Sequence, residues 1–174
     1  MDPKMLALLG AKQSPQNMPG KSDLISAETP ESNPAHQLLM LAVCYRGLQL
    51  ASHNFHNLVA RTVFGQDHSF FGDLYPKMED NYDAIIERII GLYGDSSINL
   101  QNIMMMVSQK IQDAPNASQE NKVFYQYCEQ MLKYILSEIE QMAPGCSQGT
   151  MNLLAGQADE IEVLLYKIGR RLGQ

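Results

Sequence analysis

Apolar residues recur every three or four positions over most of the chain beyond residue 34, in four long stretches separated by glycine, proline and polar residues. This spacing places the apolar side chains on one face of an α-helix. Four such helices can bury their apolar faces against one another, so the pattern predicts an all-α, up-down four-helix bundle. In chain order, the four apolar faces consist of Leu38, Leu41, Tyr45, Leu48, Ser52, Phe55 and Val59; Phe71, Leu74, Met78, Tyr82, Ile85, Ile89 and Leu92; Val123, Tyr127, Met131, Tyr134, Ile135 and Ile139; and Leu154, Ala158, Ile161, Leu165, Ile168 and Leu172.

The boundaries of the first two helices follow from glycine and polar residues. The first should end near Ala60, and the second should begin after Gln66, with Asp67 as an acid near its N-terminus. The glycines of segment 91–94 should end the second helix. Pro76 lies inside it, where a proline removes a backbone hydrogen bond, so a bend or a local irregularity is expected.

The connection between the second and third helices is long and contains one more apolar segment. Residues 98–107 have the spacing of a short extra helix, which fits either a crossover between parallel neighbours or an interface helix. The three consecutive methionines at 104–106 favour plastic packing of a core or an interface over a metal or redox role.

Residues 1–34 differ in composition from the rest of the chain. They contain five of the eight prolines, with many serines, glutamines and asparagines, which does not favour a packed structure. The sequence therefore predicts a flexible N-terminal arm over residues 1–34 and one four-helix domain over residues 35–174. Residues 5–9 form either an amphipathic turn that docks on a partner or a disordered terminus.

Charge and cysteine content narrow the functional classes. The net charge of −6 and the pI near 5.1 argue against non-specific nucleic-acid binding by the body of the protein and favour attraction of cations. Cys44, Cys128 and Cys146 lack metal-finger spacing and fit reduced thiols in a cytoplasmic protein. No apolar run approaches the ~20 residues of a membrane span, and segment 5–9 is too short for a signal peptide, so neither membrane insertion nor export is expected.

Four residues have the chemistry of metal ligands: His56, His68, Asp83 and Glu87. Asp83 and Glu87 share a helix face and could hold one cation between two carboxylates. A continuous helix places Asp83 roughly 22 Å from His68, so one subunit cannot use all four together. A two-fold-related copy would bring its histidines to these carboxylates, which predicts two equivalent sites per dimer. Singly, each residue fits a surface or capping role, but their joint spacing favours a metal site.

The spacing of these residues resembles the signature of Dps-like miniferritins. Ser-His-Asn-Phe-His at 52–56, His-Ser-Phe-Phe at 68–71 and Asp-Ala-Ile-Ile-Glu-Arg-Ile at 83–89 reproduce the family's two histidines, aspartate and glutamate at matching intervals. Gly-Thr-Met-Asn-Leu-Leu at 149–154 also looks like the opening of the family's last helix. The resemblance covers roughly residues 36–172.

This resemblance implies a ferritin-like four-helix bundle with a short extra helix between helices two and three, assembled as a hollow shell of twelve identical subunits. It implies an intersubunit ferroxidase site, with His56 and His68 from one chain and Asp83 and Glu87 from its two-fold partner. The implied function is oxidation of Fe(II), preferably by hydrogen peroxide and otherwise by oxygen, with storage of ferric mineral and protection against oxidative stress. Imidazole and carboxylate ligands suit Fe(II) without excluding Zn(II) or Co(II).

The chain departs from the family pattern near the implied site. Asn57 stands where the family usually has tryptophan, and Gly72 stands where it often has an acid, with Asp73 one position out of register. Arg61-Thr62 replaces the usual Gly-Pro of the first loop. These departures fit a weaker or singly occupied iron site and leave no inference about radical trapping by a neighbouring aromatic residue.

Other functional classes fit less well. No histidine follows a glutamate by three residues, which excludes the intrasubunit di-iron set of ordinary ferritins, and the chain contains no phosphate-binding glycine loop or zinc-protease motif. The alternative is a Dps-like, non-catalytic shell that binds DNA or another macromolecule. The arm's lysines are balanced by acids, and Arg170-Arg171 is a small basic pair, so DNA binding is not favoured.

Overall fold

The computed structural model describes residues 33–60, 63–116, 120–142 and 145–174. This part of the chain is helical and contains no β-strand, which confirms the all-α prediction. Residues 1–32 of the predicted arm (1–34) lie outside the described residues, and its last two, Asn33 and Pro34, cap and begin the first helix. The elements are α1 (Pro34–Leu58), α2 (Phe64–Tyr93), the short 3-10 helix η3 (Asp95–Ser97), α3 (Leu100–Lys110), α4 (Asn121–Met142) and α5 (Gln148–Leu172).

Local capping explains several of the helix ends. The side chain of Asn33 accepts a hydrogen bond from the backbone N–H of Ala35, and Pro34 occupies the first turn, where its missing N–H leaves no bond unmade. Gly94 ends α2 with a φ of 86°, a conformation that side-chain-bearing residues rarely adopt. Ser147 caps α5 by accepting from the N–H of Thr150.

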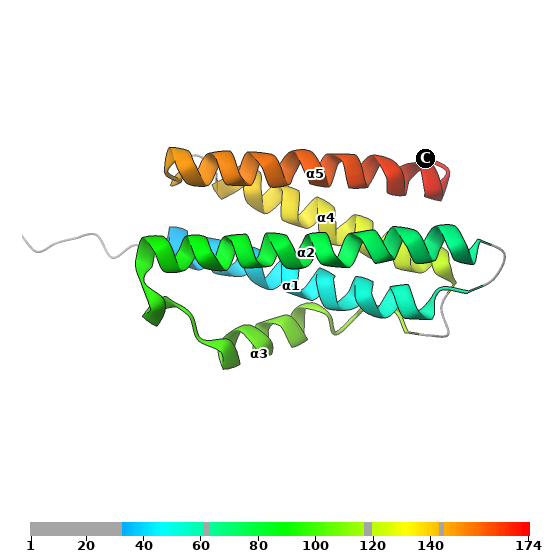
Figure 1. The fold of residues 1–174 in the computed structure, drawn as a ribbon, viewed down its shortest axis with the longest axis horizontal. Helices are drawn as coiled ribbons and strands as arrows, with labels where there is room; N and C mark the ends of the chain where they lie inside the picture. Colours follow the sequence, from blue (N-terminus) through cyan, green and yellow to red (C-terminus); the bar gives the residue numbers. More distant parts are fainter. Residues whose placement is uncertain (1–32, 61–62, 117–119, 143–144) are drawn as a thin grey trace, which may run out of the picture.

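The long helices do not alternate strictly up and down. A short loop makes α1 and α2 an antiparallel hairpin, and α4 and α5 form a second one (Figure 1). Asn121, at the start of α4, bonds to Asp67, near the start of α2, so α2 and α4 begin at the same end of the bundle. The order is therefore up, down, down, up. The physical reason is the connection through α3, which crosses the length of the bundle and returns the chain to that end.

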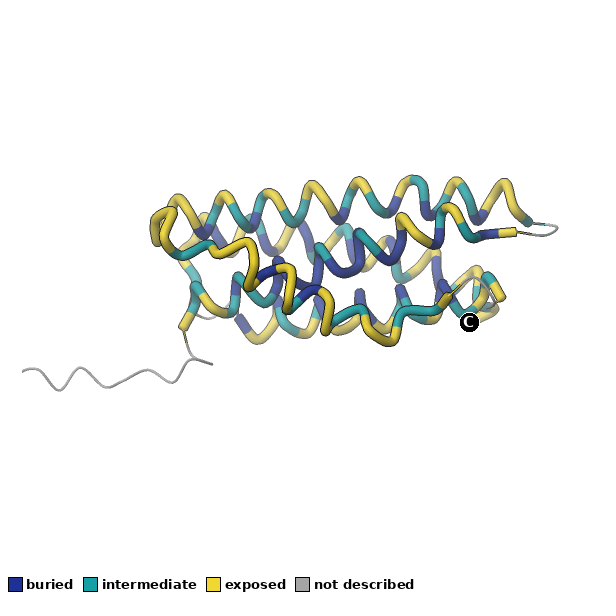
Figure 2. The backbone as a smooth tube through the Cα atoms, turned by 90° about the horizontal axis from the view of Figure 1, so that it is seen from below, coloured by how far each residue is buried: buried dark blue, intermediate teal, exposed yellow. Residues whose placement is uncertain are grey.

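The core lies where the faces of the four long helices meet (Figure 2). The whole apolar face expected on the first helix is buried. The second face is buried except for half-buried Tyr82 and for Leu92, which is 48% exposed beside the helix end. On α4 the burial is shifted: Tyr134 is exposed, and the helix also buries a set of residues that the predicted face omitted. These are Phe124, Tyr125, Cys128, Leu132 and Met142.

The start of α2 differs from the prediction. The helix begins at Phe64, includes the expected break at Gln66 and continues through Pro76 to Tyr93 as one α-helix. Pro76 has no N–H to donate to the carbonyl of Gly72, but the helix accommodates this without interruption. Asp67 is in the first turn as predicted, but its carboxylate is buried inside the bundle.

The short extra helix, α3, packs across α1. Ile103 and Val107 are buried in a small cluster with Val43, whereas Met104 and Met105 are exposed. Among the described residues, no helix is both long enough and apolar enough to cross a membrane.

Candidate metal-binding site

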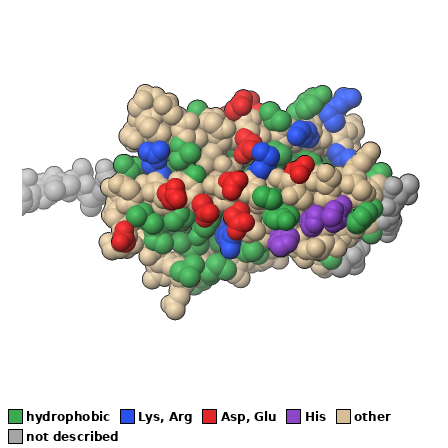
Figure 3. All heavy atoms as spheres, viewed as in Figure 1, with side chains coloured by type: hydrophobic (Ala, Val, Ile, Leu, Met, Phe, Trp, Pro, Cys, Tyr) green, Lys and Arg blue, Asp and Glu red, His purple; other side chains and the backbone are tan. Residues whose placement is uncertain are grey.

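His56 and His68 lie side by side at the end of the α1–α2 hairpin where the loop joins the two helices. His56 is in the last turn of α1, and His68 is near the start of α2. Their ring centroids are 3.7 Å apart, and both side chains are half-buried. Figure 3 shows histidine side chains gathered at this end of the molecular face, with carboxylates in its middle and toward its other end.

A hydrogen bond fixes the orientation of the His56 ring. Its Nδ1 atom lies 2.9 Å from the backbone carbonyl oxygen of His68. Because a carbonyl oxygen can only accept, Nδ1 carries the proton and donates it. In a neutral imidazole the lone pair is then on Nε2, and such bonding through the other ring nitrogen is how proteins orient metal-binding histidines.

Aromatic residues surround the histidine pair. His53 stacks on Tyr75 at 4.4 Å between ring centroids, and Tyr75 meets the His56 ring edge-on at 5.7 Å. The ring of Phe64 lies 4.9 Å from that of His68 between centroids. His53 is therefore held by an aromatic ring at the edge of the site, and no hydrogen bond connects it to His56 in the described structure.

Asp83 and Glu87 lie much farther along α2, and both are exposed. Because α2 is unbroken, its rise of ~1.5 Å per residue places them roughly 22 Å and 28 Å from His68. Glu87 lines a groove of about 430 Å³ whose other walls are Ala84, Arg88, Gly91, Leu92 and Leu153. The groove lies between the C-terminal part of α2 and the start of α5.

One chain therefore carries the candidate ligands as two separate pairs and does not bring the four together. Within the described residues, no three histidine, cysteine, aspartate or glutamate side chains are arranged to hold a metal ion. The histidine pair provides two nitrogen donors, and the carboxylate pair provides oxygen donors on one exposed helix face.

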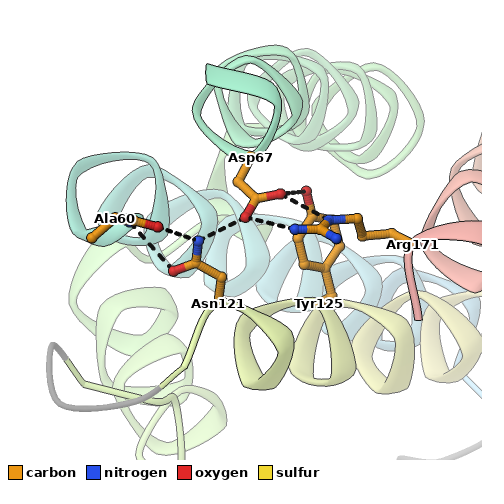
Figure 4. A network of polar contacts seen from close by, with 5 residues as sticks. All are labelled: Ala60, Asp67, Asn121, Tyr125 and Arg171. Atoms are coloured by element: carbon orange, nitrogen blue, oxygen red, sulfur yellow. Dashed lines mark hydrogen bonds and ion pairs between the residues drawn. The ribbon is translucent and has the colours of Figure 1, made fainter. Parts of the chain in front are cut away.

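A polar network surrounds the carboxylate of Asp67, the residue that precedes His68 in the sequence (Figure 4). The carboxylate of Asp67 is 0% exposed and accepts hydrogen bonds from three side chains. Arg171 donates through Nε at 2.9 Å and Nη2 at 3.2 Å, Tyr125 donates at 2.9 Å, and Asn121 donates at 2.7 Å. Asn121 also donates to the carbonyl of Ala60, so the network ties the α1–α2 loop to α4 and α5.

The network sets the charge states of its members. Burial alone raises the pKa of the Asp67 carboxyl, but the hydrogen bonds from Arg171, Asn121 and Tyr125 outweigh it and hold the pKa below its ordinary value of 3.8. Burial, and then the bond to Asp67, raises the pKa of Tyr125, so its hydroxyl stays protonated and donates. The segment that begins with His68 is therefore anchored by an ionised, fully paired carboxylate.

No protein-family model matches this chain, and no curated protein matches it.

Proposed function

We propose that this chain is a Dps-like miniferritin: a homo-oligomeric protein that oxidises Fe(II) at sites shared between subunits and stores the ferric product. The observation that carries the proposal is that the candidate ligands form two pairs, the proposed half-sites, separated along α2. Two histidines meet at one end, and two carboxylates one turn apart lie on the same helix beyond its middle. A two-fold axis near the middle of α2 would place each half-site against the other half-site of the partner.

The topology supports the ferritin-like part of the proposal. Four long helices in the order up, down, down, up, with one long crossover, are the arrangement of ferritin-like bundles. The short α3 lies within that crossover, as the resemblance implies. A hollow shell of twelve subunits is part of the proposal and needs contacts beyond the two-fold pair.

Each half-site contributes a different kind of ligand to Fe(II). In His56, Nδ1 donates its proton to the His68 carbonyl, so Nε2 of the same ring keeps a lone pair for the metal. His68 supplies the second imidazole. Asp83 and Glu87 of the partner supply anionic oxygens that favour the higher charge of Fe(III). Two Fe(II) ions give up one electron each, and these two electrons reduce one hydrogen peroxide to two hydroxide ions without releasing a hydroxyl radical.

Gly72 bears on the number of irons per site. It stands where the family often has an acid, and a Cβ there would lie 3.2 Å from the His56 ring, so this chain offers no carboxylate beside the histidine pair at that position. The proposal is therefore one tightly held iron per site, with the second Fe(II) of each turnover arriving from solution and giving its electron to the same peroxide before that peroxide leaves the site.

The test is anaerobic addition of Fe(II) to the purified protein, followed by hydrogen peroxide, with ferric absorbance recorded. His56→Ala and Glu87→Ala should reduce the oxidation rate to that of buffer. The matched controls, His36→Ala and Glu162→Ala, replace exposed residues of the same types elsewhere and should react like the wild type. Equal rates in all five proteins, or a wild-type rate no faster than buffer, would contradict the proposal. Salt-sensitive DNA retention without iron oxidation would favour the non-catalytic alternative.

A further inference from the structure

Asn121 bonds to both of the segments that carry the histidine pair, although its own helix carries no candidate ligand. It is the first residue of α4, and its side-chain amide lies between the end of α1 and the start of α2 (Figure 4). Nδ2 donates to the carbonyl oxygen of Ala60 at 2.9 Å and to Oδ2 of Asp67 at 2.7 Å. Oδ1 of the same amide accepts from the N–H of Ala60 at 3.4 Å. One side chain therefore joins the two ends of the α1–α2 hairpin loop.

The two contacts of Asn121 lie close to the histidines along the chain. Ala60 is four residues beyond His56, just past the end of α1, and Asp67 is the residue before His68 in the first turn of α2. The amide therefore spans the same gap between the two helices as the 2.9 Å contact from Nδ1 of His56 to the carbonyl oxygen of His68. A change in the separation of the helix ends would change the length and the angle of that hydrogen bond.

We infer that Asn121 is a positioning residue for the metal site. Its amide holds the end of α1 and the start of α2 at the separation at which Nδ1 of His56 donates to the His68 carbonyl, and this keeps the Nε2 lone pair of His56 available to a metal. This role rests on the proposed function for its metal, whereas the orientation of the ring needs no metal.

The chemistry of the contacts calls for an amide. The Ala60 carbonyl and the Asp67 carboxylate offer acceptor oxygens to Nδ2, and the Ala60 backbone N–H offers a donor to Oδ1. An asparagine side chain supplies two N–H donors and one acceptor oxygen from a single planar group. A serine hydroxyl has one hydrogen and can serve only one of the two acceptors at a time, and alanine can serve neither.

The other members of the network hold Asp67 without reaching α1. Arg171 donates to the Asp67 carboxylate at 2.9 Å and 3.2 Å, and Tyr125 donates to it at 2.9 Å. Within the described part of the chain, neither side chain bonds to Ala60, so Asn121 is the member of the network that is bonded to both helix ends. Arg171 should therefore matter mainly for the stability of the fold, and Asn121 for the spacing of the histidine pair.

Solid-state ¹⁵N NMR with labelled histidine reads the orientation of the ring directly. The chain has four histidines, and loss of one signal in His56→Gln assigns His56. At pH 8.5, about two units above the ordinary imidazole pKa of ~6.5, the spectrum shows which ring nitrogen carries the proton. In the wild type, the His56 proton should be on Nδ1. In Asn121→Ala the fraction of molecules with this proton on Nδ1 should fall to about half or less, because the bond to the His68 carbonyl lengthens.

Two further variants make this readout specific. Asn121→Ser, which retains one donor, should shift the His56 proton in the same direction and reads the effect if Asn121→Ala does not fold. Asn152→Ala is the matched control, since Asn152 is an exposed asparagine of α5 that bonds to Gln148, and it should give the wild-type spectrum. A His56 proton that stays on Nδ1 in the folded Asn121 variants would overturn the inference.

Arg171→Met separates positioning from overall stability. It removes a charge-assisted pair from a buried carboxylate, so it should lower the urea midpoint of unfolding more than Asn121→Ala does. The His56 proton should nevertheless stay on Nδ1, because Asn121 still joins Ala60 to Asp67. A larger loss of the Nδ1 proton in Arg171→Met than in Asn121→Ala would show that the ring follows the stability of the fold, and would overturn the inference.

A Co(II) titration, recorded by visible absorption, connects the orientation of the ring to the metal. Asn121→Ala should weaken Co(II) binding by ~10-fold or more, and Asn152→Ala should leave it unchanged. Iron oxidation that needs His56 and Glu87, with an unchanged His56 spectrum and unchanged Co(II) affinity in Asn121→Ala, would overturn the positioning role alone. A His56 proton that moves in Asn121→Ala, in a protein whose wild type neither binds Co(II) nor oxidises Fe(II), would overturn the proposed function but leave the orientation of the ring by Asn121 standing.

Discussion

Gly72 of α2 lies directly against the imidazole ring of His56 in α1: a Cβ built on this glycine would stand 3.2 Å from both Cε1 and Nδ1 of that ring. Such a distance is shorter than ordinary van der Waals contact, so any side chain at position 72 must displace the ring. The ring displacement that a Cβ at position 72 requires is a few tenths of an ångström, and it would act on the ring whose Nδ1 lies 2.9 Å from the His68 carbonyl oxygen.

Gly72→Ala should separate metal binding from stability. Alanine favours a helix interior by about 0.5–1 kcal/mol over glycine, which offsets the crowding, so the free energy of unfolding should stay within about 1 kcal/mol of wild type. Loss of the bond that orients His56 should weaken Co(II) binding by ~10-fold or more, measured by visible absorption titration. Gly156→Ala, in an open part of α5, is the control for adding a methyl group to a helix. Unchanged Co(II) affinity in Gly72→Ala would show that the ring orientation does not matter.

Asp67→Asn should destabilise the fold. The substitution removes the charge that Arg171 pairs with and replaces an acceptor oxygen by an NH₂ group facing other donors. Since Arg171 is partly open to solvent, the expected loss is about 2 kcal/mol, below the 3–5 kcal/mol typical of a fully buried broken pair. Urea unfolding measures it. Glu129→Gln, which breaks the exposed pair with Lys133, should change stability by about 0.5 kcal/mol or less. Equal losses of stability in Asp67→Asn and Glu129→Gln would contradict a stabilising role for the Asp67 network.

The contribution of Asp67 should also depend on pH in a defined direction. The folded pKa of this carboxyl lies below its ordinary value of 3.8, so the ionised form is the one that stabilises the fold. The stability difference between wild type and Asp67→Asn should be full above about pH 5 and shrink as the pH falls through 3.8 and below. Urea unfolding of both proteins between pH 3 and pH 7 measures this difference. A stability difference that grows on acidification would show that the ionised form of Asp67 does not stabilise the fold.

The cysteines should differ in reactivity. Burial raises the pKa of Cys44 to about 11 and also raises that of Cys128, whereas Cys146 is only half-buried. With a pKa near 11, about one Cys44 thiol in a thousand is ionised at pH 8, and the thiolate is the reactive form. An aromatic disulfide reagent should therefore label Cys146 first in the native protein and all three thiols only after unfolding. Equal labelling rates in the native state would contradict this.

The helical pattern of the sequence predicted most of the fold because it depends on local spacing. The apolar face of α1 and the glycine end of α2 emerge as expected. The buried face of α4 did not, because this helix packs over a broader face than one stripe of three- and four-residue steps, and Tyr125 and Cys128 lie beside the predicted line.

The positions of the candidate ligands along α1 and α2 were predictable from spacing, but their surroundings were not. The carboxylate of Asp67 is buried where Arg171 donates hydrogen bonds to it. The two residues are 104 positions apart, and a local sequence pattern cannot predict a contact between them. Tyr75 reaches His53 and His56 only because the α1–α2 hairpin packs in one particular register. The groove beside Glu87 likewise includes Leu153 of α5. Local spacing does not predict that Leu153 lies against the C-terminal part of α2.

The most direct test of the shared site is complementation between two inactive variants. One carries His56→Ala and His68→Ala, and the other carries Asp83→Ala and Glu87→Ala. Coexpressed with different affinity tags and purified through both, mixed dimers should contain one intact site of the two and oxidise Fe(II) at up to about half the wild-type rate, while each variant alone stays at the buffer rate. Mixed dimers as inactive as the separate variants, beside an active wild type, would contradict a site built from the histidines of one chain and the carboxylates of its partner.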